Sequence, residues 1–217
     1  MAAVVPLSDA SRRPTTFPAA TLGLIIVNVI VFLFELAFGD SFVLRWSMVP
    51  AHITAGHDLE TIFTAMFMHA SWGHIIGNMV FLWAFGPEIE DRMGRWRYLV
   101  FYVLGGVAAA GMQIAFDPHS TVPNLGASGA IAAVMGAFLV TFPSDEIRSI
   151  LAIFIFVRIT YIPAILLIGV WFLLQLWNAG QIAPQASSGV AYLAHVGGFI
   201  FGAVFARLFQ RSAGEPE

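Results

Sequence analysis

Long apolar stretches recur along this 217-residue chain, and they limit its fold more than any other feature. A helix needs about 20 apolar residues to cross a lipid bilayer. Only 11% of the residues are charged, whereas soluble domains contain roughly 25%. We therefore expect an all-α membrane protein with six transmembrane helices. The predicted spans are residues 19–38, 72–85, 98–116, 126–142, 159–177 and 189–209.

The arginines orient these spans, because basic residues gather on the cytoplasmic side of membrane proteins. Six crossings place both chain ends on one side, which would leave Arg45 alone on the other side. We expect nine arginines on the side of the chain ends, and therefore cytoplasmic N and C termini: residues 12, 13, 92, 95, 97, 148, 158, 207 and 211. The predicted membrane domain is residues 19–210, between a mobile N-terminal tail at 1–18 and a C-terminal tail at 211–217.

The composition and the missing motifs argue against several kinds of site and partner. The chain has no cysteine, which excludes disulfides and cysteine–metal sites. A zinc site among His52, His57 and His69 stays open, although no HExxH motif occurs. We expect no cofactor, and a net charge of −3 gives no reason to expect nucleic acid as a partner.

The connection at 40–59 mixes aromatic and polar residues, which suits a segment in the membrane interface.

Four polar side chains are expected at one depth in the membrane. His74 lies near the outer end of the second span, Ser128 in the first turn of the fourth, and His195 about two turns into the sixth. Asn78 follows His74 by four residues and so shares its helix face. Polar groups at membrane depth usually face the interior of a helix bundle or a water-filled cavity. These four side chains should therefore converge.

Stripes of small residues would bring the serine and one histidine together. Ser128 begins a stripe that continues through Ala132 and Gly136, and His195 shares a face with Gly198 and Gly202. Such stripes let helices pack closely. A serine beside a histidine is the minimum for nucleophilic catalysis. No carboxylate lies at a matching depth, so we expect a Ser–His dyad. The alternative is that the serine and the small stripes serve helix packing alone.

Four segments resemble those of one known family, in the same order. The segment from His74 to Asn78 resembles HxxxN, Gly126 to Gly129 resembles GxSG, and Ala194 to Gly198 resembles AHxGG. The segment from Gly86 to Gly94 resembles an acidic turn after the second helix. Over about residues 20–210 the chain resembles the rhomboid intramembrane serine proteases, which implies a rhomboid-like bundle of six helices.

The resemblance implies a role for each site residue. Ser128 would be the nucleophile, His195 the general base, and His74 with Asn78 would stabilise the oxyanion. The substrates would be transmembrane proteins, cut near the outer face of the bilayer. The fifth helix would act as a gate and the loop at 178–188 as a cap. The family often has an aromatic residue at the position of Ala132, where it holds the catalytic histidine. Here either another group holds His195 or its ring is oriented more loosely.

Two other functions stay open. One is a non-catalytic rhomboid-like protein that binds membrane helices for quality control, although such relatives usually lack the serine or the histidine. The other is a small channel or transporter, which would need ionisable residues through the bilayer centre. Six spans with short tails suit a bacterial inner membrane, so we expect a multi-pass protein of the bacterial plasma membrane.

Overall fold

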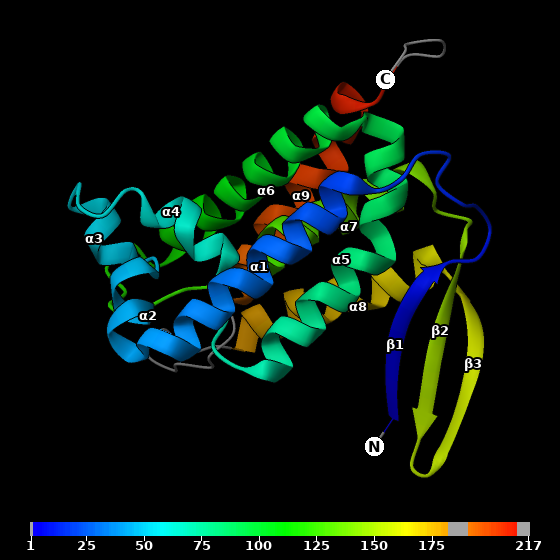
Figure 1. Cartoon of the computed structure of the whole chain (residues 1–217), viewed down its shortest axis with the longest axis horizontal. Helices are drawn as coiled ribbons and strands as arrows, with labels where there is room; N and C mark the ends of the chain where they lie inside the picture. The colour runs from blue at the N-terminus through cyan, green and yellow to red at the C-terminus, as the bar shows by residue number, and fades with distance from the viewer. Residues whose placement is uncertain (1, 182–190, 212–217) are drawn as a thin grey trace.

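Helices dominate the computed structural model, which describes residues 2–181 and 191–211. Six helices of 14 or more residues form one bundle within these ranges (Figure 1): α1 (Ala19–Phe38), α5 (Trp72–Met93), α6 (Arg95–Phe116), α7 (Ser128–Thr141), α8 (Ala164–Gln181) and α9 (Tyr192–Phe209). By length and composition, α1, α6 and α9 could each cross a membrane. The predicted helical membrane protein is thereby confirmed in outline.

Helix α5 is longer than the predicted span. The acidic segment from Gly86 was expected to be a turn, but it forms the last two turns of α5, and the chain reverses only at Gly94, where φ is +79°. The buried carboxylate of Glu90 explains why a charge is tolerated there. It accepts hydrogen bonds from the backbone N–H groups of Ala20 and Thr21, at 2.8 and 2.7 Å. Glu90 thus satisfies N–H groups at the start of α1 that have no partner within that helix.

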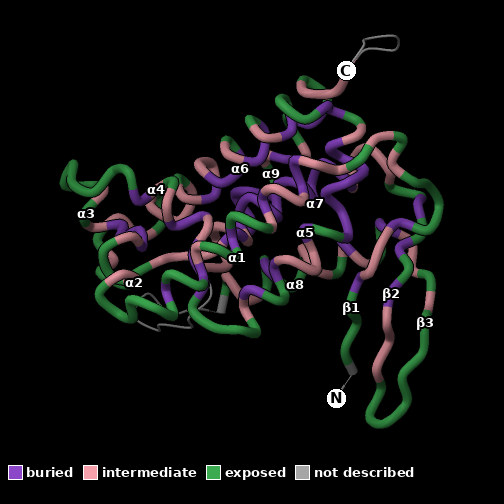
Figure 2. Tube along the Cα trace, viewed as in Figure 1, coloured by how far each residue is buried: buried purple, intermediate pink, exposed green. Residues whose placement is uncertain are grey.

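Helix α7 is the centre of the bundle. All of its residues from 129 to 138 are buried, and Figure 2 shows this segment surrounded by the other helices. A Cβ atom added at Gly202 would lie 1.9 Å from the backbone oxygen of Ala133, and one at Gly198 would lie 2.0 Å from that of Gly129. The backbones of α7 and α9 are therefore in direct contact. The close packing predicted from the two small stripes is confirmed.

A three-stranded antiparallel sheet was not predicted. It comprises β1 (Ala2–Asp9), β2 (Glu146–Ile153) and β3 (Phe156–Pro163), in the order β1-β2-β3. Residues 2–9 are thus a paired strand, so the expectation of a mobile tail was wrong there. The fifth span was also placed too early, because its first residues belong to β3.

The local sequence explains this hairpin. Residues 157–162 are rich in β-branched and aromatic residues, which favour strands. Pro163 disfavours a helical conformation at Ile162, so α8 is not expected to extend back through that residue. Apolar content alone does not distinguish such strands from a membrane helix.

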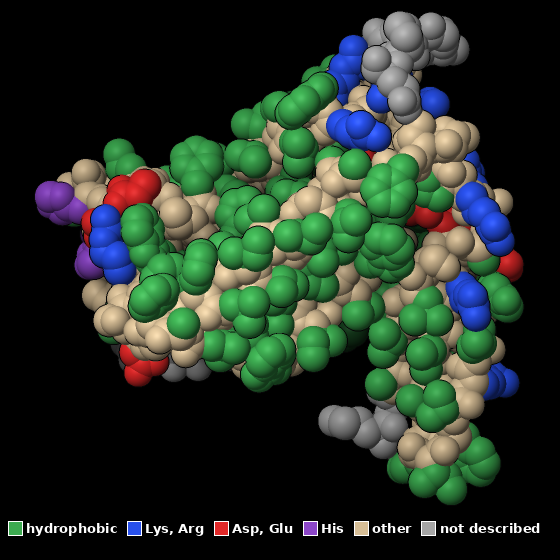
Figure 3. Space-filling model, viewed as in Figure 1, with side chains coloured by type: hydrophobic (Ala, Val, Ile, Leu, Met, Phe, Trp, Pro, Cys, Tyr) green, Lys and Arg blue, Asp and Glu red, His purple; other side chains and the backbone are tan. Residues whose placement is uncertain are grey.

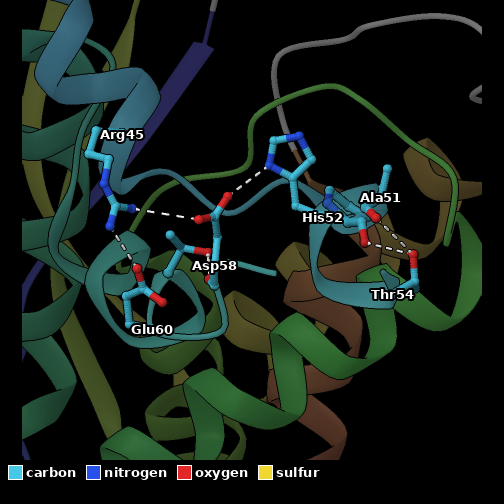
Figure 4. Close-up of polar contacts among 8 residues, drawn as sticks. Arg45, Ala51, His52, Thr54, Asp58 and Glu60 are labelled. Atoms are coloured by element: carbon cyan, nitrogen blue, oxygen red, sulfur yellow. Dashed lines mark hydrogen bonds and ion pairs between the residues drawn. The ribbon is translucent and has the colours of Figure 1, made fainter. Parts of the chain in front are cut away.

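Short helices fill the connection between α1 and α5: α2 (Asp40–Trp46), α3 (Pro50–Thr54), α4 (Thr61–Thr64) and the 3₁₀ helix η1 (Ala65–Phe67). Arg45 holds this connection together through Glu60, at 2.9 Å, and Asp58, at 3.8 Å (Figure 4). His52 bonds Asp58 at 3.0 Å. Within the described residues, no group of three or more histidines and carboxylates is arranged to hold a metal ion.

Candidate active site

Ser128 is the first residue of α7, and His195 lies in the second turn of α9. The Nε2 atom of His195 is 2.7 Å from the Oγ atom of Ser128. The close contact between the two helix backbones produces this approach. It places a histidine where it can accept the proton of the serine hydroxyl.

A third residue, Gln175, meets the same histidine ring. Its Oε1 atom is 2.8 Å from Nδ1 of His195, and the residue is 8% exposed. The ring of Trp171, one turn earlier on α8, lies 5.9 Å from the imidazole, tilted by 33°. Helix α8 therefore supplies the contacts that Ala132 cannot make. A lone glutamine in an apolar span was the signal that sequence reasoning missed, since such residues usually face the bundle interior.

His74 also lies beside the serine. A Cβ atom at Gly126 would be 2.9 Å from Cε1 of His74 and 3.5 Å from Oγ of Ser128. Gly126 has a φ of +136°, in the region that favours glycine. The glycine thus lets the imidazole of His74 pack against the backbone directly before the serine.

Asn78 has a partner that the sequence did not predict. Its amide nitrogen is 2.9 Å from Nε2 of His69, a buried residue that the sequence analysis had considered only for a zinc site. The backbone N–H of His69 donates in turn to the buried carboxylate of Glu35, at 3.0 Å. Burial, and to a smaller extent His74, lowers the pKa of His69 to about 4. A neutral His69 can accept at Nε2 from one Asn78 N–H, which leaves the second N–H for another acceptor.

A small cavity adjoins the nucleophile. It measures about 50 Å³, and Ser128, Gly126, Asn124 and Met66 are among the residues that line it. A water molecule needs roughly 10–15 Å³ of such space. The cavity can therefore hold water next to the serine hydroxyl.

The predicted residues are thus gathered from separate elements. Ser128 and His195 are in direct contact, and His74 packs beside the serine. Asn78 bonds His69, whose ring centroid is 5.1 Å from that of His74. The predicted cap at 178–188 lies largely outside the described residues. Chemically, the arrangement offers a nucleophile, a base, nearby hydrogen-bond donors and space for water.

Comparison with known proteins finds related sequences. A model of the rhomboid domain matches residues 56–212. The chain is 32% identical to RHOMBOID-like protein 12, mitochondrial, of Arabidopsis thaliana, over 52% of this chain and 39% of the relative. It is 27% identical to Rhomboid protein 1, mitochondrial, of Saccharomyces cerevisiae, over 93% of this chain and 56% of the relative.

Bacterial relatives also match. The chain is 27% identical to Rhomboid protease GlpG of Klebsiella pneumoniae, over 54% of this chain and 41% of that protein. It spans about half the length of the curated relatives it matches. Since the rhomboid model covers most of the sequence, the chain belongs to the rhomboid family.

Proposed function

We propose that this chain is an intramembrane serine endopeptidase that cleaves transmembrane segments of other proteins near the outer face of the bilayer. The contact of 2.7 Å between His195 Nε2 and Ser128 Oγ carries the proposal. The name of the bacterial relative supports it, since that protein is described as a rhomboid protease.

The proposed mechanism begins with attack of Ser128 Oγ on the peptide carbonyl carbon, while Nε2 of His195 takes the hydroxyl proton. The oxyanion accepts hydrogen bonds from His74, the free N–H of Asn78 and backbone N–H groups at the start of α7, which have no acceptor within the helix. His195 then protonates the leaving amine as the C–N bond breaks. A water molecule from the cavity hydrolyses the acyl-enzyme, again with His195 as base.

Six membrane crossings, with both chain ends on the cytoplasmic side, form part of the proposal. The pairing of β1 with β2 supports it, because four long helices separate these strands and an even number of crossings returns the chain to one side. The backbone N–H of Arg211 also donates to the carbonyl of Arg92, at 3.1 Å. Figure 3 shows basic side chains at the end of the bundle next to the C terminus.

The names of the relatives point to more than one membrane. Named relatives come from mitochondria, from chloroplasts and from bacteria. These names support a membrane-embedded rhomboid protein. They do not support the bacterial plasma membrane that sequence analysis predicted.

Covalent labelling tests the proposed function. The purified protein is treated with a fluorophosphonate, and the added mass is located by intact and peptide mass spectrometry. We expect labelling at Ser128 that is lost in Ser128→Ala and His195→Ala and retained in Ser149→Ala, a buried serine of β2. Absence of labelling, together with no cleavage of a membrane-helix substrate in liposomes, would favour the non-catalytic helix-binding function.

A further inference from the structure

We infer that Gln175 is a positioning residue, which fixes His195 in the tautomer that can accept the serine proton and does so only while α8 is packed against α9. This inference rests on the proposed function. It adds a third residue to the expected dyad, and it places that residue on the helix expected to act as the gate.

The orientation of the Gln175 amide determines the tautomer. Its NH₂ group donates to the backbone oxygen of Trp171, at 3.3 Å, so its Oε1 faces Nδ1 of His195. An amide oxygen can only accept hydrogen bonds, so Nδ1 must carry the proton of the neutral ring. The lone pair is then on Nε2, which faces Ser128 Oγ at 2.7 Å. The other tautomer would place two acceptors against each other at Nδ1, and its Nε2–H could only donate to Ser128 Oγ, not accept the serine proton.

Burial strengthens the preference of His195 for the tautomer with its proton on Nδ1. Gln175 is 8% exposed and His195 is 9% exposed. Water cannot readily replace a partner at such a site, and a buried polar group without a partner is costly. The amide is uncharged, however, so it cannot stabilise the imidazolium as the aspartate of a catalytic triad does. Gln175 therefore positions the ring without supplying a charge.

The contact depends on the position of α8. This helix packs on α9 through side chains, chiefly the stacked rings of Phe172 and Phe199, whose centroids are 4.1 Å apart. A Cβ atom added at Gly169 of α8 would meet nothing within 4 Å, whereas Cβ atoms added at Gly198 and Gly202 of α9 would meet the backbone of α7. Helix α8 can therefore separate from its neighbour more easily than α9 can. Separation would withdraw Oε1 and leave the tautomer of His195 unspecified.

Replacement by an apolar residue of similar shape tests the role of Gln175. In Gln175→Met we expect the rate of fluorophosphonate labelling at Ser128 to fall about tenfold, since one neutral hydrogen bond is lost. Gln175→Glu restores an oxygen acceptor and should recover part of the rate, with a changed pH profile. Gln210→Met is the matched control, at the opposite end of the bundle, and should label at the wild-type rate.

Nitrogen NMR of ¹⁵N-labelled histidine gives a readout that does not depend on activity. The wild-type signal of His195 should show a proton on Nδ1, and Gln175→Met should show a mixture of tautomers. An unchanged tautomer, with labelling within twofold of wild type, would overturn the inference. If the wild-type protein neither labels nor cleaves a membrane-helix substrate, the proposed function fails, and the NMR signal still tests the positioning role.

A double-mutant cycle tests the dependence on α8. Phe172→Ala removes the stacking on α9, so it should shift the tautomer ratio in the same direction as Gln175→Met. The combined variant should show no further shift, because both changes act through one hydrogen bond. Equal tautomer ratios in Phe172→Ala and the wild type would contradict a dependence on α8.

Discussion

The contact between α7 and α9 at Gly202 predicts a large effect from adding one methyl group. In Gly202→Ala the new Cβ would lie 1.9 Å from the backbone oxygen of Ala133, and an ordinary contact begins at 3.4 Å. The two helices must therefore separate locally by about 1.5 Å, the difference between these distances. Because the atom that must yield belongs to a backbone and not to a flexible side chain, relaxation is limited.

Two opposing effects set the magnitude. Replacing glycine by alanine in a helix is favourable by up to about 1 kcal/mol, but overpacking a core usually costs about 1–3 kcal/mol. Since the overlap here is with the backbone, we expect a net loss of roughly 2 kcal/mol in unfolding free energy. This corresponds to a fall of roughly 4–8 °C in Tm for a chain of this size. His195 lies two turns earlier on the same helix, so its bond to Ser128 should lengthen and labelling should slow.

Thermal unfolding in detergent, followed by tryptophan fluorescence, measures the change. Gly111→Ala is the matched control, because a Cβ atom there meets nothing within 4 Å, so this variant should be as stable as the wild type or slightly more stable. If Gly202→Ala and Gly111→Ala melt at the same temperature, the backbone contact between α7 and α9 does not exist as described.

Three further predictions concern single side chains. Ser128→Ala should abolish labelling and change Tm by less than Gly202→Ala does; an equal loss of stability would identify the serine as a packing residue. The pKa of His69, about 4, lies below the ordinary value of roughly 6.5, so the folded state binds fewer protons between these values. Stability should therefore decrease as pH falls from about 6.5 to 4, by on the order of 3 kcal/mol, and His69→Gln should flatten this dependence in pH-dependent unfolding. Asp145→Asn weakens the pair with Arg12 and should cost about 1 kcal/mol, seen as faster hydrogen exchange in β1; unchanged exchange would show that the pair does not hold this strand.

The sequence predicted those parts of the site that depend on helix periodicity. Helix α1 begins and ends at the predicted residues, and the small stripes predicted the approach of His195 to Ser128. Position along a helix determines both the depth and the face of a residue, so counting residues along each predicted span was sufficient to place Ser128 and His195.

Contacts that depend on side-chain rotamers or on distant pairing were missed. Asn78 could bond a substrate or a neighbour with equal ease, and only the three-dimensional arrangement shows His69 as its partner. The hairpin of β2 and β3 was hidden because an apolar strand and the start of an apolar helix have the same composition. Gln175 was overlooked because its role depends on the rotation of α8 about its own axis.

The pairing of β1 with β2 has a consequence for biosynthesis. Asp9 pairs with Ile147, so the ribosome must add 138 residues after β1 before its partner strand exists. At about 5–20 residues per second, this takes roughly 7–28 seconds. Helices α1, α5, α6 and α7 are all synthesised in that interval, while β1 keeps an unpaired edge that another strand could occupy. The sheet is therefore expected to close late, after most of the bundle has been made, and a nascent chain stalled before residue 147 would be left with an exposed N-terminal strand.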